Sequence, residues 1–255
     1  MRPNSLKAKL RAGQRVVGAL ITINSPELVE TFGHLGYDFV FIDGQHGGLG
    51  VETARELIRA AELTDMTPLV RVRKNDPAEI LEYLDAGAGG VIVPDVTSRA
   101  EVEAAAKATR YPTRGTRGAM AMSRAAFYGV PQAGAGYYRR ADEEILCCAI
   151  FENHAVLGEL DAAVRVPDLD VVVIGPGDLS LSMGIPGGWK DPRVQTEVTR
   201  IHAAARAAGK PAMIVALDHD DGRRLLAEGY QALLVVTGPL IVNAARSFLQ
   251  ILRSV

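Results

Sequence analysis

Residues 145–152, ILCCAIFE, and residues 169–178, LDVVVIGPGD, are two apolar runs that each lead to a carboxylate. Runs of this length that are rich in valine, isoleucine and leucine are typical of strands buried on both faces of a parallel sheet. A carboxylate at the exit of such a strand is costly unless something pairs with it. Glu152 and Asp178 on nearby strands would form an oxygen-rich site for a hard divalent cation such as Mg²⁺ or Mn²⁺. The pattern therefore indicates a metal-dependent enzyme.

A strand-like run followed by a helix-like run recurs along the whole chain. Strands are predicted at residues 16–23, 39–43, 68–72, 90–96, 145–152, 169–175, 211–217 and 232–237. Helices are predicted at residues 26–35, 51–62, 77–86, 99–109, 155–164, 194–208, 220–228 and 239–255. This strict alternation predicts an α/β fold, a single (β/α)8 TIM-barrel domain over residues 1–255. A doubly wound sheet is the alternative, but no glycine-rich dinucleotide fingerprint follows the first strand.

Residues that start and stop helices agree with these boundaries. Ser25 and Asp76 each precede a proline and resemble N-caps, and Gly87, Gly209 and Gly229 resemble C-terminal glycines. One connection is longer than the others, from residue 111 to residue 144. A loop of this length in a compact domain usually has a function. The alternative is a mobile surface loop without one. The arginines in this connection are Arg114, Arg117, Arg124, Arg139 and Arg140.

The composition limits the partners of the chain. Its 255 residues are 48% hydrophobic, and its formal net charge of −2 argues against nucleic acid or an anionic membrane as partner. No apolar run approaches the ~18 residues that span a bilayer, and the first residues lack the apolar stretch of a signal peptide. Cys147 and Cys148 are neighbours in a predicted strand, where side chains point to opposite faces, so they are interpreted as core thiols. We expect a cytoplasmic protein.

If the barrel is correct, active-site groups lie at the carboxyl ends of the strands. Asp43 and His46 follow the second predicted strand, and Arg71 ends the third. An unpaired guanidinium in a buried strand is implausible, so Arg71 requires a structural ion pair or a bound anion. Asp43 could instead cap a turn, and His46 could be a solvated loop histidine. Asp95 and Thr237 also stand at strand ends.

The turn Gly175-Pro176-Gly177-Asp178 has two possible uses. Asp178 could be the N-cap of the following helix without binding a metal. Alternatively, backbone N–H groups at this helix start would bind a carboxylate beside the cation. The site would then chelate a 2-oxo acid, and the cation and Arg71 would both oppose negative charge growing on the ketone oxygen.

At these residues the chain resembles the HpcH/HpaI aldolase/citrate lyase family, specifically its metal-dependent pyruvate aldolases. The resemblance covers nearly the whole chain, and the similar blocks occur in order at similar spacing. They are FVFIDGQHGG at 39–48, PLVRVRKND at 68–76, LDAGAGGVIVP at 84–94, TRYPTRGTRG at 109–118, Glu152, IGPGDLS at 174–180 and Glu228-Gly-Tyr.

The resemblance implies a role for each site residue. Glu152 and Asp178 would hold Mg²⁺, Mn²⁺ or Co²⁺ together with pyruvate, and Arg71 would contact the enolate oxygen. The Gly177 and Asp178 amides, in the turn that contains Pro176, would bind the pyruvate carboxylate. His46 would be the acid/base and act through a metal-bound water, with Asp43 close by. Asp85 would reach into a neighbouring subunit to pair with its histidine.

The resemblance also implies a homo-hexamer, a trimer of dimers, whose C-terminal helices are exchanged between barrels. It implies a class II aldolase that reversibly cleaves a 4-hydroxy-2-oxo acid to pyruvate and an aldehyde through a metal-bound pyruvate enolate. Gln45 and Ile150 depart from the pattern, since many relatives have glutamate and glutamine there. The departure at Ile150 bears on substrate range more than on enolate chemistry.

Three other functions are alternatives to this one. A Schiff-base aldolase needs an active-site lysine, and no predicted strand carries a lysine at its carboxyl end. An oxaloacetate decarboxylase, or a lyase of the citrate or malyl-CoA type, would use the same enolate site with different loops. A barrel that has lost catalysis and serves as a binding or assembly subunit would show no metal-dependent turnover.

Overall fold

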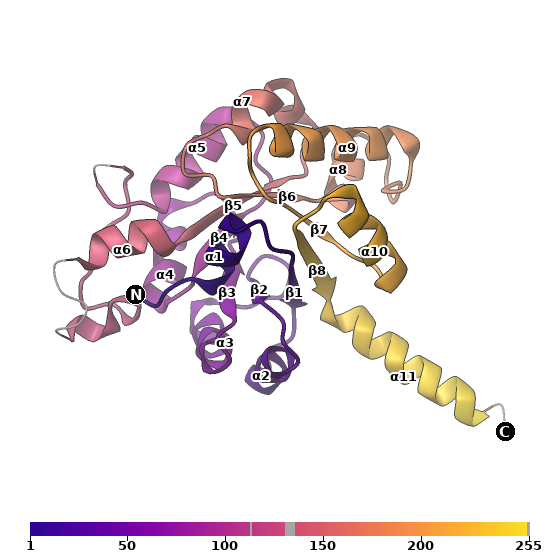
Figure 1. The fold of residues 1–255 in the computed structure, drawn as a ribbon, viewed down its shortest axis with the longest axis horizontal. Helices are drawn as coiled ribbons and strands as arrows, with labels where there is room; N and C mark the ends of the chain where they lie inside the picture. The colour runs from indigo at the N-terminus through magenta and orange to yellow at the C-terminus, as the bar shows by residue number, and fades with distance from the viewer. Residues whose placement is uncertain (113, 131–135, 254–255) are drawn as a thin grey trace.

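Eight parallel strands close into a barrel in the order of the sequence, and β1 pairs with β8 (Figure 1). The computed structural model describes residues 1–112, 114–130 and 136–253. The predicted (β/α)8 barrel is therefore confirmed, and the doubly wound alternative is excluded. The strands are β1 (Val16–Ile21), β2 (Phe39–Asp43), β3 (Thr67–Arg71), β4 (Gly90–Val93), β5 (Leu146–Phe151), β6 (Val171–Ile174), β7 (Ala212–Val215) and β8 (Ala232–Val236).

The core lies on both sides of the barrel wall, because successive side chains of a strand point to opposite faces. One cluster fills the barrel interior and contains Phe41, Cys148 and Ile150. The larger cluster lies between the strands and the surrounding helices and contains Cys147. The two adjacent cysteines are thus buried free thiols on opposite faces, as the sequence predicts. Burial on both faces explains why the strands lack polar alternation.

The helices agree closely with the predicted ranges. They are α1 (Ser5–Arg11), α2 (Pro26–His34), α3 (Val51–Leu63), α4 (Pro77–Ala86), α5 (Arg99–Ala108), α6 (Tyr137–Glu144), α7 (Leu160–Val164), α8 (Pro176–Ser182), α9 (Pro192–Ala207), α10 (His219–Glu228) and α11 (Thr237–Arg253). The side chains of Ser25 and Asp76 cap α2 and α4, and Gly87 and Gly229 end α4 and α10 in the left-handed conformation. These predicted caps are confirmed.

Besides α8, which lies in none of the predicted helix ranges, three features differ from the prediction. The range 155–164 divides into a 3-10 helix, η2 (His154–Glu159), and the short α7. The long connection contains another 3-10 helix, η1 (Arg124–Gly129), and α6, while residues 113 and 131–135 lie outside the described residues. Three of its arginines form ion pairs within the chain: Arg114 with Asp168, Arg117 with Asp85, and Arg124 with Glu62.

The third difference is α1, which covers the amino-terminal end of the barrel. Leu6 and Leu10 enter the interior cluster from below. Lys7 donates to the carbonyl of Ile145 at 2.6 Å and lies 3.0 Å from Asp170. Asp170 also accepts from the buried Arg110 at 2.7 Å. We refer to Lys7, Arg110 and Asp170 as the basal cluster, since it joins α1 to the strand starts.

Helix α11 projects away from the barrel (Figure 1). Its first residue, Thr237, is buried and donates its hydroxyl to the carbonyl of Leu20 at 2.8 Å, so Thr237 joins the start of the helix to β1. Ile241, Phe248 and Leu252 form an exposed apolar stripe along it, and Phe248 is 66% exposed. Within the described residues, no helix has the length and apolar character needed to cross a bilayer.

Candidate active site

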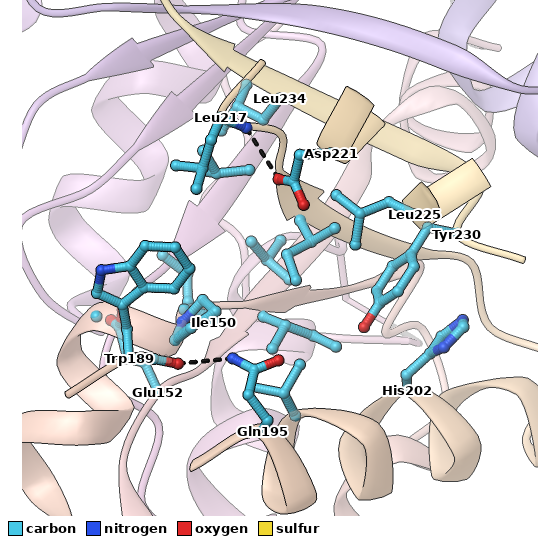
Figure 2. A pocket seen from close by; sticks show the side chains of 18 of the residues that line it. Ile150, Glu152, Trp189, Gln195, His202, Leu217, Asp221, Leu225, Tyr230 and Leu234 are labelled. Carbon is cyan, nitrogen blue, oxygen red and sulfur yellow. Dashed lines mark hydrogen bonds between the residues drawn. The ribbon is translucent and has the colours of Figure 1, made fainter. Parts of the chain in front are cut away.

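A cavity of about 800 Å³ opens at the carboxyl ends of the strands. It is lined by five of the predicted site residues: Arg71, Glu152, Pro176, Gly177 and Asp178. Figure 2 shows Glu152 at one end of this cavity, beside Ile150 and Trp189. The other three predicted residues, Asp43, His46 and Asp85, do not line it. The barrel therefore brings together the two carboxylates, the arginine and the glycine turn.

Glu152 follows β5 directly and is only 5% exposed. Its Oε1 accepts a hydrogen bond of 2.9 Å from the backbone N–H of Asp95. Asp95 has a φ of 52°, an uncommon conformation for a residue other than glycine. On the other side, a Cβ atom at Gly175 would lie 2.6 Å from Oε2 of Glu152. The missing side chain of Gly175 thus leaves room for the carboxylate.

The Glu152 carboxylate lacks a compensating cation. Burial raises its pKa to about 7, and the negative charge of Asp178 adds to this effect. The Asp95 N–H group and the charge of Arg71 lower the pKa of Glu152 but do not offset burial. A bound cation would remove both the desolvation penalty and the repulsion from Asp178.

Arg71, in contrast, is compensated by Asp43. Its Nε and Nη2 atoms donate to the two carboxylate oxygens of Asp43 at 2.9 and 2.6 Å. Burial alone would raise the pKa of Asp43, but this bidentate pair and the N–H groups of His46 and Gln45 hold the pKa below its ordinary value. Asp43 is 1% exposed and fixes the guanidinium at the cavity wall. The Nη1 atom has no hydrogen-bond partner among the described residues, so it is the donor left for a ligand.

His46 and Asp85 lie apart from the cavity within this chain. The side chain of His46 is exposed, and its backbone N–H donates to Asp43 at 3.1 Å. Asp85 lies in the last turn of α4, where Arg117 donates to its Oδ1 at 2.8 Å. Asp43 therefore also orders the turn that carries His46, as its alternative role as a turn cap predicts.

Asp178 lies in the first turn of α8 and is exposed. The N-cap of α8 is Gly175, and no side chain caps this helix. The N-cap role considered for Asp178 is therefore wrong. As residues of the first turn, Gly177 and Asp178 have backbone N–H groups without an intrahelical acceptor, so these amides can bind an anion.

The donor set fits a hard divalent cation with an incomplete protein shell. The described residues contain no group of three or more His, Cys, Asp or Glu side chains arranged to hold a metal ion. The buried Glu152 and the exposed Asp178 supply two carboxylates that repel each other. Mg²⁺ is commonly held by one or two carboxylates, with substrate and water completing its coordination.

Sequence reasoning missed the contribution of Asp95. The residue was noted at the end of the fourth predicted strand, but its backbone N–H, and not its carboxylate, contacts Glu152. The Asp95 side chain instead accepts from Asn153 at 2.8 Å. A backbone donor carries no residue-type signal, so only the position of Asp95 at a strand end could have indicated it.

The chain folds as a (β/α)8 barrel and carries charged groups in a cavity at the carboxyl ends of its strands. This is the position of the active site in (β/α)8-barrel enzymes. Residues 17–244 match the family described as HpcH/HpaI aldolase/citrate lyase. The chain belongs to this family. It is similar to the hydroxypyruvate/pyruvate aldolase of Sagittula stellata, with 34% identity over 242 residues, 95% of this chain and 94% of the relative.

Two solved structures support the same assignment. A HpcH/HpaI aldolase/citrate lyase family protein from Burkholderia cenocepacia J2315 superposes with a TM-score of 0.93 at 29% identity, covering 98% of this chain and 99% of that one. The citrate synthase SbnG superposes with a TM-score of 0.87 at 31% identity, covering 98% of both chains. The barrel is therefore shared with proteins named for different carbon–carbon bond reactions.

Proposed function

We propose that the chain is a class II, metal-dependent pyruvate aldolase. It would reversibly cleave a 4-hydroxy-2-oxo acid to pyruvate and an aldehyde. The observation that carries this proposal is the uncompensated carboxylate pair, Glu152 and Asp178, which shares one cavity with Arg71 and the amides of the glycine turn. The aldolase name of the relative from Sagittula stellata agrees with it.

Glu152 and Asp178 would hold the cation, which could be Mg²⁺, Mn²⁺ or Co²⁺ because carboxylate oxygens accept all three. The bound cation would supply a Lewis acid that stabilises negative charge on the oxygen of a 2-oxo acid. The amides of Gly177 and Asp178 would bind the substrate carboxylate, with Pro176 fixing the start of the turn. These contacts would orient the ketone toward Arg71.

Arg71 would stabilise the pyruvate enolate through its free Nη1 atom, since Nε and Nη2 are occupied by Asp43. In cleavage, the C4 hydroxyl loses its proton, the C3–C4 bond breaks, and its electron pair forms the enolate. His46 would take that proton through water, and protonation at C3 would complete pyruvate. Asp85 would pair with the histidine of a neighbouring subunit. This agrees with the position of Asp85 outside the cavity of its own chain.

We also propose that the protein is a homo-hexamer, a trimer of dimers, in which α11 is exchanged between barrels. The exposed apolar stripe of α11 supports this, because such surfaces commonly mark protein interfaces. Phe248→Asp should lower the mass found by light scattering, whereas Ser247→Asp on the same helix should not. A single mass for all three proteins would exclude a role for this stripe in assembly.

Residues 1–255 are proposed to act as one domain, because one closed barrel carries the core on both sides of its wall. A cytoplasmic location is proposed as well, since both cysteines are buried free thiols.

Exchange of the pyruvate methyl protons in D₂O tests the enolate step without any aldehyde. NMR should show exchange with added Mg²⁺ or Mn²⁺, no exchange after EDTA, and recovery when the cation is restored. Exchange that survives chelation would exclude the metal assignment. Replacing His46 by Ala should slow aldol cleavage by roughly 10²- to 10⁴-fold.

The similarity to a citrate synthase favours a second candidate with the same enolate chemistry. An oxaloacetate decarboxylase, or a lyase of the citrate or malyl-CoA type, would show turnover of oxaloacetate or a CoA thioester that exceeds turnover of hydroxy-oxo acids. A non-catalytic barrel would show no metal-dependent exchange at all.

A further inference from the structure

The cavity extends well beyond the site that pyruvate would fill. From Glu152 it passes Trp189 and Gln195 and continues between α9 and α10. Figure 2 shows Glu152 and Trp189 at one end and the rings of His202 and Tyr230 at the other. A three-carbon acid occupies a small part of about 800 Å³. We call the extension the α9–α10 arm and define it by Val198, His202, Ile214, Leu225 and Tyr230.

The walls of this arm are apolar. Val198 comes from α9, Leu225 from α10, and Ile214 from the outer face of β7. The charged residues at its rim compensate one another: Arg224 donates to Asp221 and to Glu228, each at 2.6 Å. With Arg206, the rim carries two cationic and two anionic side chains, so it does not favour a ligand of either charge.

His202 supplies the polar end of the arm. It is 7% exposed and stacks on Tyr230 with ring centroids 3.8 Å apart and an interplanar angle of 12°. Burial lowers the pKa of His202 below its ordinary value, and the charge of Arg206 adds to this effect. A hydrogen bond to the backbone of Gly229 works in the other direction. The buried Nε2 atom has no hydrogen-bond partner, which is costly unless a ligand supplies one.

We infer that the α9–α10 arm binds the side chain of the aldehyde substrate, and that this aldehyde carries an uncharged apolar chain or ring with a hydrogen-bonding group at its far end. The inference rests on the proposed aldolase function, because the arm is continuous with the Glu152 site. The reaction itself is unchanged: C3 of the pyruvate enolate adds to the aldehyde carbon, and the resulting alkoxide takes a proton.

The first test is the rate of aldol addition of pyruvate to aldehydes of increasing length. Glycolaldehyde, propanal, hexanal and benzaldehyde are compared with the Mn²⁺-loaded full-length protein. The value of kcat/KM should rise by roughly fourfold for each methylene group that enters the arm. A flat series, or a preference for glycolaldehyde, would overturn the inference.

A second test narrows the arm from an exposed position. Ala203 lines the cavity and is exposed, so Ala203→Trp should fill the arm without disturbing the core. This variant should lower kcat/KM for hexanal by about tenfold or more. The value of kcat/KM for glycolaldehyde and the rate of pyruvate proton exchange should stay unchanged. Ala207→Trp is the matched control, because Ala207 is exposed on α9 but does not line the cavity.

A third test concerns His202. His202→Phe keeps a ring that can stack on Tyr230 but removes Nε2. The variant should reduce kcat/KM for 4-hydroxybenzaldehyde by about tenfold relative to benzaldehyde. Equal effects on both aldehydes would remove Nε2 from the inference.

The proton-exchange readout separates the two levels of the proposal. Loss of pyruvate exchange in the unmodified protein would overturn the aldolase function and the arm with it. Intact exchange with no dependence on aldehyde length, or with equal effects of Ala203→Trp on every aldehyde, would overturn only the arm.

Discussion

Buried charges occur at both ends of the barrel, but only at the amino-terminal end are they paired with an opposite charge in the basal cluster. In the basal cluster, Asp170 contacts both Lys7 and Arg110, and Lys7 also reaches a backbone carbonyl. At the mouth, Glu152 is as buried as Lys7 and Arg110 are, and the nearby Arg71 is already bound to Asp43. The cations of the basal cluster are paired with a carboxylate, whereas the carboxylate of Glu152 has no cationic side chain paired with it among the described residues. The difference agrees with the division of barrels into a stabilising amino-terminal face and a catalytic carboxyl-terminal face.

The largest expected effect comes from removing the charge of Glu152 at the mouth of the barrel. Glu152→Gln should reduce metal-dependent cleavage by about 10³-fold or more, the scale of losing a contact that stabilises transition-state charge. The same change should not lower the thermal midpoint, because the amide removes a repulsion with Asp178. Steady-state assays and thermal melting check both parts. Retained activity would show that Glu152 is not a metal ligand.

Removing the carboxylate of the basal cluster should lower the stability of the protein and leave its activity unchanged. Asp170→Asn would leave the buried Lys7 without its ion pair and Arg110 with only Asp168, 3.5 Å away. The free energy of unfolding should fall by about 3 kcal/mol, while kcat/KM of the folded fraction stays unchanged. Denaturant unfolding and assays at low temperature measure the two quantities. A loss of activity without a loss of stability would contradict the comparison.

A smaller effect is expected from filling the space beside Glu152. Gly175→Ala would place a Cβ atom 2.6 Å from Oε2 of Glu152 and displace the carboxylate. The affinity for the cation should fall by roughly 10- to 100-fold, as when a supporting contact of a metal ligand is lost. Gly158→Ala is a suitable control, since a Cβ there meets nothing within 4 Å. Mn²⁺ titration monitored by calorimetry gives the affinities.

The smallest effect concerns pH. The folded-state pKa of Glu152 is about 7, above its ordinary 4.5, so the folded metal-free protein binds this proton more strongly than the unfolded chain does. Stability of the metal-free protein should therefore decline as pH rises from 4.5 to 7 and then level off. Added Mg²⁺ or Mn²⁺ should raise the thermal midpoint more at pH 8 than at pH 5.5.

Glu152→Gln should remove this difference between the two pH values. A difference that persists in the variant would assign the titration to another group.

The sequence predicts the barrel well because its signals are local. Helix α4 begins and ends where Asp76-Pro77 and Gly87 indicate, and the strands lie within their predicted ranges except β3, which begins one residue earlier, at Thr67. Helix α1 is not predicted because it is short and is ordered by tertiary contacts. Leu6 packs in the interior cluster of the barrel, and Lys7 belongs to the basal cluster. The range 155–164 was predicted as one helix, but it begins as a 3-10 turn around Gly158.

The site was predicted less completely, because its properties depend on distances through space. The positions of Arg71 and Glu152 at strand ends, and of Asp178 shortly after a strand, follow from the apolar runs that precede them. The bidentate contact between Arg71 and Asp43 joins residues 28 positions apart, and the sequence indicates an ion pair of Arg71 only as one of two alternatives, without its partner. The Asp95 amide and the space at Gly175 have no side chain that could signal them. The presence of the α9–α10 arm depends on the distance between helices α9 and α10, which the sequence does not specify.

The order of strands around the barrel has a consequence for protein engineering. The groups that surround Glu152 come from residues 43–95 and 152–178, whereas the walls of the α9–α10 arm come from residues 195–230. These stretches do not overlap in the gene. A mutant library confined to codons 195–230 can therefore reshape the arm while every codon of the carboxylate site stays fixed, so selection for new aldehydes can proceed on a constant catalytic background.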